Sequence, residues 1–186
     1  VVCHGIPTKK YLKEGDIVNI DVTAIVNGWH GDTSRMFFVG DVSVKSKNLV
    51  STTYNSMMRA IAIIKSGVNL GDIGEAIQTY AEKNGFSVVR DYSGHCIGKT
   101  FHEPPNILHY GKKGEGIKLE TGMIFTVEPM INEGIYNTKL LNDGWTAVTK
   151  DKSLSAQFEH TIGVTKDGFE IFTKSKKKYE QPPYLI

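Results

Sequence analysis

The chain has 186 residues, of which 40% are hydrophobic and 23% are charged, and its formal net charge is +2 at pH 7. This composition fits one globular core, and no apolar run approaches the roughly 20 residues that a membrane-spanning helix requires. The near-neutral charge indicates no specific nucleic-acid or membrane partner. Two cysteines, Cys3 and Cys96, favour free thiols in a reducing cytoplasm over a disulfide framework.

The first predicted element is a β-hairpin. Residues 16–26 are rich in β-branched side chains, and residues 27–28 are Asn-Gly, the preferred two-residue hairpin loop. This loop sets the register and places Thr23 opposite Asp32. Asp21 and Asp32 are then diagonal neighbours on one face of the hairpin, roughly 7–8 Å apart at the backbone and within reach of a shared metal pair.

Alternation along the first strand of this hairpin separates a polar face from an apolar one. Asn19, Asp21 and Thr23 share the polar face, which is costly to bury unless something satisfies it, as a metal would. The other face is apolar, and its members are Val18, Ile20, Val22, Ala24 and Val26.

Two helices are predicted next, over residues 47–66 and 72–84. In each segment apolar residues recur at helical spacing, and a glycine follows the last of them, Gly67 in the first case and Gly85 in the second. We expect both helices to pack an apolar face against the sheet.

Three further polar side chains lie in segments that otherwise read as strands or tight turns. Glu128 interrupts the apolar run 123–130, and Glu159 points away from the apolar positions of 157–164. His95 lies between two glycines that allow its backbone to turn tightly. Each carboxylate alone would be an ordinary strand-end glutamate, but four acids beside apolar neighbours indicate a common site.

Together these five residues form an oxygen-rich ligand set: Asp21, Asp32, His95, Glu128 and Glu159. Such a set can hold two divalent cations that share carboxylates, an arrangement that activates water for hydrolysis. Mixed aspartate, glutamate and histidine ligation accepts cobalt, manganese, iron or zinc, and the sequence does not choose between these metals.

Several stretches resemble bacterial type I methionine aminopeptidases, in order and without a large insertion between Val1 and about Thr173. They are residues 2–7, 15–22, 30–33, 94–98, 101–103, 125–129 and 155–161. The resemblance implies the pita-bread fold, an α+β fold in which a curved antiparallel sheet is backed by helices. It also implies removal of the initiator methionine from nascent polypeptides by a monomeric cytoplasmic enzyme that works near the ribosome.

The resemblance further implies how the ligands divide. Asp21 would chelate one metal, Asp32 and Glu159 would bridge both, and His95 and Glu128 would complete the second. Glu128 would also act as the general base.

Other residues match family positions that contact the substrate rather than the metal. His4 and His102 would position the scissile amide, stabilise the tetrahedral intermediate and carry a proton to the leaving amine. Three residues match family positions that line the pocket for the substrate methionine, and they are His4, Phe101 and Trp145. Val1 and Ser155 match positions that bind a monovalent cation in some members.

The chain departs from the family pattern in two places. Cys96 stands where a glycine is usual, which bears on how His95 is presented. The sequence also starts at Val1, where a family-length chain is already well advanced. We therefore expect a catalytic domain over residues 1–173 that lacks an N-terminal segment of helices and pocket residues, followed by a basic, proline-containing tail over 174–186 that extends into solvent. Whether a targeting peptide precedes the domain is left open.

Two other functions remain compatible with the residues. An X-Pro aminopeptidase or dipeptidase shares the metal ligands, although the motifs around His4 and His102 fit the methionine enzyme better. A pita-bread protein without catalysis, either a peptide-binding module or an inactive fragment, is the second alternative. It is disfavoured because all five ligands are present.

Overall fold

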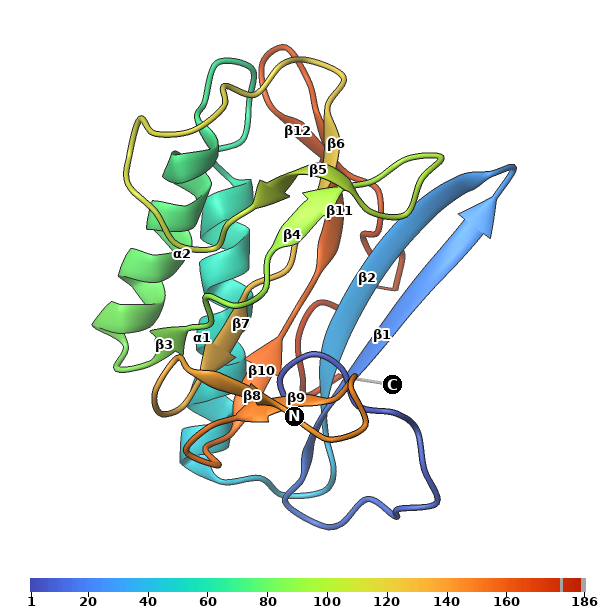
Figure 1. Cartoon of the computed structure of the whole chain (residues 1–186), viewed down its shortest axis with the longest axis vertical. Helices are drawn as coiled ribbons and strands as arrows, with labels where there is room; N and C mark the ends of the chain where they lie inside the picture. The colour runs from blue at the N-terminus through green and yellow to red at the C-terminus, as the bar shows by residue number, and fades with distance from the viewer. Residues whose placement is uncertain (178, 185–186) are drawn as a thin grey trace.

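The computed structural model describes residues 1–177 and 179–184. Two helices lie side by side against one side of a set of short antiparallel strands, and a long hairpin runs along the other side (Figure 1). In chain order the elements are β1 (Ile17–Val26), β2 (Trp29–Phe38), α1 (Val44–Ile61), α2 (Leu70–Lys83), β3 (Ser87–Val88), β4 (Gly94–Cys96), β5 (Glu103–Ile107), β6 (Ile124–Val127), β7 (Met130–Asn132), β8 (Thr138–Leu140), β9 (Ala147–Thr149), β10 (Ser155–Gln157), β11 (His160–Val164) and β12 (Phe169–Ile171).

The strands form four hydrogen-bonded groups. One sheet has the order β12-β11-β6-β4-β5, a second has the order β10-β7-β3, and the pairs β1-β2 and β8-β9 complete the set. Every pairing between named strands is antiparallel. Helices packed against antiparallel strands confirm the predicted α+β class.

The two larger sheets are joined by two strands that bend at the same level. β6 leads into β7 after two residues, and β10 leads into β11 after two residues. Val127 pairs with His160 before the bend and Met130 pairs with Gln157 after it, so a single register runs through both sheets. The two interruptions therefore face each other, with Glu128 opposite Glu159.

The predicted hairpin register is confirmed. Thr23 pairs with Asp32 and Asp21 with Ser34. Asn27 and Gly28 both have positive φ, 51° and 81°, as a type I′ turn requires, and this turn matches the twist of the flanking strands.

Most of the apolar face of β1 is exposed. Ile20, Val22 and Val26 are 50%, 54% and 66% exposed, because no helix or strand among the described residues packs over them. Alternation identifies the two faces of a strand but not the layer that covers each face.

The helices occupy the predicted segments with different ends. α1 begins at Val44, earlier than predicted, because the Ser43 hydroxyl accepts a hydrogen bond from the Ser46 backbone N–H. It ends at Ile61 rather than at residue 66, and Ile64 stays buried in the turns that follow. The helix α2 begins at Leu70, two residues before the predicted start, where the Asp72 carboxylate accepts a hydrogen bond from the backbone N–H of Asn69.

The core lies between the two helices and the concave strands. Its largest fully buried side chains include Leu49 and Ile61 of α1, Ile77 of α2 and Phe125 of β6. No helix in the described part of the chain is long and apolar enough to span a bilayer.

The described part of the C-terminal tail folds back on the hairpin. The Tyr184 hydroxyl donates to the Met36 carbonyl at 2.9 Å, and its ring packs 5.2 Å from that of Phe37. The expected solvated extension is therefore corrected for Tyr184, while Lys174, Lys176 and Lys177 are exposed as expected. Lys178 and residues 185–186 of this tail lie outside the described residues.

Candidate metal centre

Glu128 and Glu159 occupy the two facing bends of the sheet, and both are buried, at 7% and 2% exposure. A bend frees a side chain from the regular alternation of a strand, so that it can turn toward the concave side. Pro129 follows Glu128 and has no N–H to contribute to a ladder, which is consistent with a break at this point.

The β2 strand is fastened to the segment that carries Glu159. The Asp32 N–H donates to the Thr161 hydroxyl at 2.9 Å, and that hydroxyl donates to the Asp32 carbonyl at 2.8 Å. The Glu159 N–H donates to the Ser34 carbonyl at 3.1 Å, and the Thr33 hydroxyl donates to the Glu159 carbonyl at 2.9 Å. These bonds fix Asp32 beside Glu159.

His95, on β4, is held next to Glu128 by Thr126. The Thr126 hydroxyl accepts from the His95 N–H at 3.0 Å and donates to Glu128 Oε1 at 2.6 Å. The imidazole Nδ1 lies 3.0 Å from the Cys96 carbonyl. A carbonyl can only accept, so Nδ1 carries the proton and Nε2 keeps a lone pair for a metal. This Nε2 lies 3.6 Å from Glu128 Oε1.

The structure brings the five predicted ligands together. One ligand atom from each of Asp32, His95 and Glu159 lies within 4.8 Å of the others. Glu128 Oε1 lies 3.6 Å from His95 Nε2, and Asp21, whose pKa burial raises, lies close enough to Asp32 for the charge of Asp32 to raise that pKa further. The five side chains come from three strands and the two bends, and they are Asp21 (β1), Asp32 (β2), His95 (β4), Glu128 (β6–β7 bend) and Glu159 (β10–β11 bend).

This crowding changes the acidity of the carboxyl groups. Burial, and then the charge of Asp32, raise the pKa of Asp21 to about 7. Burial raises the pKa of Glu128 to about 8, with Asp21 and Asp32 adding to the rise against the Thr126 hydrogen bond. Burial, and then the charge of Glu128, raise the pKa of Glu159 well above its ordinary value. Burial lowers the pKa of His95.

The donor set fits divalent cations. Among the described residues no lysine or arginine forms an ion pair with any of the four carboxylates, so their charges are not balanced by a basic side chain. Glu159 Oε1 is buried and has no hydrogen-bond partner among the described residues. A buried polar atom without a partner is costly, and a cation would satisfy it.

Of the residues predicted to contact substrate, His4, Phe101 and His102 lie beside this cluster. The His102 ring lies 4.3 Å from the His95 ring and 3.9 Å from Phe101. His4 Nε2 lies 3.4 Å from Asp21 Oδ2, and burial lowers the pKa of His4. Trp145 lies on the turn between β8 and β9 and is 58% exposed.

The two residues predicted to bind a monovalent cation, Val1 and Ser155, are not linked to each other by a hydrogen bond among the described residues. Ser155 begins β10, and Val1 precedes a residue whose N–H donates to the Ala147 carbonyl. Their role stays a prediction from the family resemblance.

Three residues that contact Glu128 were missed by sequence reasoning. Thr126 bonds Glu128 Oε1, the Gln157 amide donates to Oε2 at 3.3 Å, and the Glu128 N–H donates to His109 Nε2 at 3.1 Å. Thr126 lies two residues before Glu128 in the same strand-like run, so the period-2 pattern predicts that both side chains share a face, and Thr126 could have been found from the sequence. His109 lies in a loop, where no periodic signal marks it.

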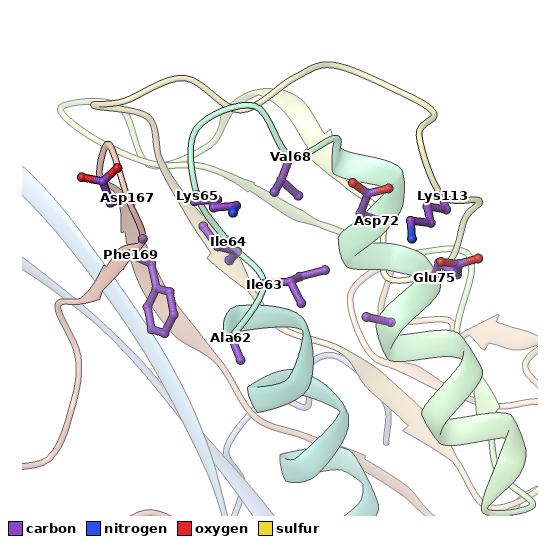
Figure 2. A pocket seen from close by; sticks show the side chains of 12 residues that line it. Ala62, Ile63, Ile64, Lys65, Val68, Asp72, Glu75, Lys113, Asp167 and Phe169 are labelled. Carbon is purple, nitrogen blue, oxygen red and sulfur yellow. The ribbon is translucent and has the colours of Figure 1, made fainter.

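A wide surface cavity of about 610 Å³ lies elsewhere, where α1 ends and α2 begins (Figure 2). Ile63, Val68 and Phe169 give it an apolar lining, and charged side chains of both signs surround it, among them Lys113 and Asp167. None of the five candidate ligands lines this cavity.

Without metal, the stability of the protein should fall as the pH rises from about 5.5 to about 8.5. In the fold the pKa values of Asp21 and Glu128 are about 7 and about 8. In an unfolded chain both pKa values are near 4, so between about pH 4 and these folded-state values the folded protein binds more protons than the unfolded chain. The free energy of unfolding therefore falls as the pH rises through 7 and 8. Thermal unfolding in excess chelator should show a midpoint lower by ~5 °C at the higher pH. A midpoint that rises over this interval would contradict the crowding of the acids.

Comparison with known proteins agrees with this geometry. Residues 1–166 match the model of metallopeptidase family M24. The chain is 65% identical over 185 residues to a methionine aminopeptidase of Rickettsia prowazekii, an alignment that covers 99% of this chain and 71% of the relative. The crystal structure of methionine aminopeptidase from Rickettsia prowazekii superposes with a TM-score of 0.91 at 66% identity, covering 92% of this chain and 70% of that one.

A more distant structure shows what is common to the fold. The prolidase of Pyrococcus furiosus superposes with a TM-score of 0.73 at 25% identity and covers 93% of this chain and 45% of its own. These likenesses confirm the pita-bread architecture, and their identities separate the methionine aminopeptidases from the proline-directed relative. The chain, which spans about 70% of the length of the Rickettsia relative, belongs to metallopeptidase family M24 and, within it, to the methionine aminopeptidases.

Proposed function

We propose that this chain removes the N-terminal methionine from newly made polypeptides with the help of two divalent cations held by Asp21, Asp32, His95, Glu128 and Glu159. The observation that carries the proposal is a cluster of four carboxylates, three of them buried and Asp21 half-buried, that no lysine or arginine among the described residues neutralises. Cobalt, manganese, iron and zinc all suit this mixture of oxygen and nitrogen ligands.

When bound, divalent cations supply a Lewis acid that lowers the pKa of water and polarises a carbonyl oxygen. The side chains then have separable tasks. Glu128 holds a proton taken from the attacking water at one of its carboxylate oxygens. His102 donates a hydrogen bond to the scissile carbonyl as negative charge develops on its oxygen, and His4 passes a proton to the leaving amine.

Methionine is the proposed first residue of the substrate because the relatives that support this assignment are methionine aminopeptidases at high identity. His4, Phe101 and Trp145 are the proposed contacts to its side chain. An X-Pro aminopeptidase or dipeptidase is less supported, since the prolidase structure is only 25% identical. A cytoplasmic monomer that acts on nascent chains near the ribosome completes the proposal.

The test is the release of free amino acid from three peptides, Met-Ala-Ser, Leu-Ala-Ser and Ala-Pro-Ser, with manganese and with excess chelator. We expect methionine to be released from the first peptide in the presence of metal alone. Release of alanine from the third peptide without cleavage of the first would assign the chain to the proline-directed enzymes. Metal binding without hydrolysis of any peptide would assign it to the non-catalytic class.

Replacing His102 with alanine should lower turnover by ~10²-fold while leaving both metal equivalents bound, because we place His102 on the substrate carbonyl and not on a cation. The measurement is turnover of Met-Ala-Ser together with metal content after dialysis. Loss of one metal equivalent in this variant would show instead that His102 is a ligand.

A further inference from the structure

The backbone N–H of Glu128 is buried and has no partner in the described strands to accept its hydrogen bond. Glu128 lies in the bend after β6, which ends at Val127, and the chain then enters Pro129, which has no N–H. The Glu128 N–H is therefore not part of a strand ladder, and the residue is only 7% exposed. Leaving a buried N–H without a partner is costly, so the position of this N–H depends on finding an acceptor.

That acceptor is a histidine from another part of the chain. His109 follows β5 and is 1% exposed, and its Nε2 accepts the Glu128 N–H at 3.1 Å. Accepting this bond requires a lone pair on Nε2, so the ring proton is on Nδ1. Burial lowers the pKa of His109 to about 3, which keeps the ring neutral.

His109 is itself held by the helix layer. The loop after β5 passes so close to α2 that a Cβ at Gly74 would collide with the Tyr110 carbonyl. The Gly111 N–H also donates to the side-chain oxygen of Gln78, on the same helix, at 3.2 Å. The ring of His109 therefore spans from a segment fixed on α2 to the bend that carries Glu128.

Glu128 is fixed at three points by three different elements. His109 holds its N–H, Thr126 donates to Oε1, and Gln157 donates to Oε2. The two side-chain hydrogen bonds orient the carboxylate, but they do not by themselves fix the position of the Glu128 backbone within the bend. Catalytic geometry is sensitive to displacements of this kind, since a 1 Å misplacement can cost about 10²-fold in rate.

We propose that His109 is a positioning residue that sets the main chain of the bend at Glu128 through its Nε2 acceptor. The proposal rests on the role proposed above for Glu128, and it assigns to His109 no contact with substrate or metal. If His109 only filled space in the core, any side chain of similar volume could replace it. If His109 positions the bend, the replacement must also offer an acceptor atom where Nε2 lies.

The first test reads this hydrogen bond directly in the metal-free protein, independently of turnover. In protein labelled with nitrogen-15, we expect a scalar coupling across the hydrogen bond between the Glu128 amide nitrogen and His109 Nε2, together with slow exchange of the Glu128 amide proton. Absence of the coupling together with fast exchange would overturn the proposal, whether or not the chain proves to be an active enzyme.

The second test separates the acceptor from the bulk. His109→Leu keeps the volume and removes the acceptor, whereas His109→Gln places an amide oxygen near the position of Nε2. We expect kcat on Met-Ala-Ser to fall by ~10-fold or more in the leucine variant with KM within ~3-fold, and the glutamine variant to recover kcat to within ~3-fold of wild type.

The matched control is Ile77→Ala, which removes buried volume from α2 and should lower the midpoint of thermal unfolding without touching the bend. It should leave kcat within ~3-fold of wild type at a temperature where the protein is folded. Equal kcat in the leucine and glutamine variants would overturn the proposal, as would a loss of kcat in the control that matches that of the leucine variant.

Discussion

Replacing Glu128 with glutamine should lower turnover by at least ~10²-fold while the protein stays folded and keeps part of its metal. Glutamine has the size of glutamate and retains one oxygen ligand, but its amide cannot accept the proton from water. The Thr126 hydroxyl, which donates to Oε1 at 2.6 Å, can still donate to the amide oxygen. The loss should therefore appear in kcat rather than in the stability of the fold.

A matched control is Glu133→Gln. Glu133 lies just beyond β7 in the same sheet and pairs with Lys45 at 2.8 Å, away from the five candidate ligands. An ion pair of this kind contributes about 0–1 kcal/mol, so this variant should keep both turnover and metal. Near-normal turnover in a metal-loaded Glu128→Gln variant would remove Glu128 from the role of base.

Replacing Asp32 with asparagine should have opposite effects on the metal-free and metal-loaded proteins. Asp32 is 4% exposed and adds to the rise in pKa of Asp21, Glu128 and Glu159. Removing its charge relieves that crowding, and the asparagine oxygen can still accept the hydrogen bond from Thr23. The midpoint of thermal unfolding in chelator should therefore rise by a few degrees.

In the metal-loaded protein, the Asp32→Asn variant should unfold at a lower temperature than wild type. A ligand that binds only the folded state stabilises it by about 2.7 kcal/mol at 100 times its dissociation constant, and Asp32→Asn should lose most of that stabilisation together with ~10²-fold or more of turnover. The same substitution at Asp167, an exposed residue beside the surface cavity, is the control and should change neither midpoint. A variant at Asp32 that is stabilised by manganese as strongly as wild type would show that its carboxylate is not a ligand.

The hairpin was predictable from sequence because its register is local. The Asn27-Gly28 loop determines which residues pair, and so the diagonal placement of Asp21 and Asp32 follows from the positions of these residues along the chain. The interiors of both helices were likewise predicted by periodicity. Their ends were not, because they depend on single capping bonds such as the one accepted by Ser43.

The remaining features depend on contacts between distant segments. The facing bends that place Glu128 opposite Glu159 arise from pairing of strands about 30 residues apart, and a single strand pattern does not report its partner. His109 reaches Glu128 from a loop without periodicity. Alternation along β1 separates its two faces, but it does not say which layer covers each face, and the apolar face is exposed.

The central claim is that five side chains hold two divalent cations at the bends of the sheet. Anomalous X-ray scattering from crystals loaded with manganese tests it most directly, because it locates metal independently of turnover. We expect two anomalous peaks about 3.5–4 Å apart, bounded by Asp21, Asp32, His95, Glu128 and Glu159. A single peak at full loading, or peaks away from these side chains, would contradict the account.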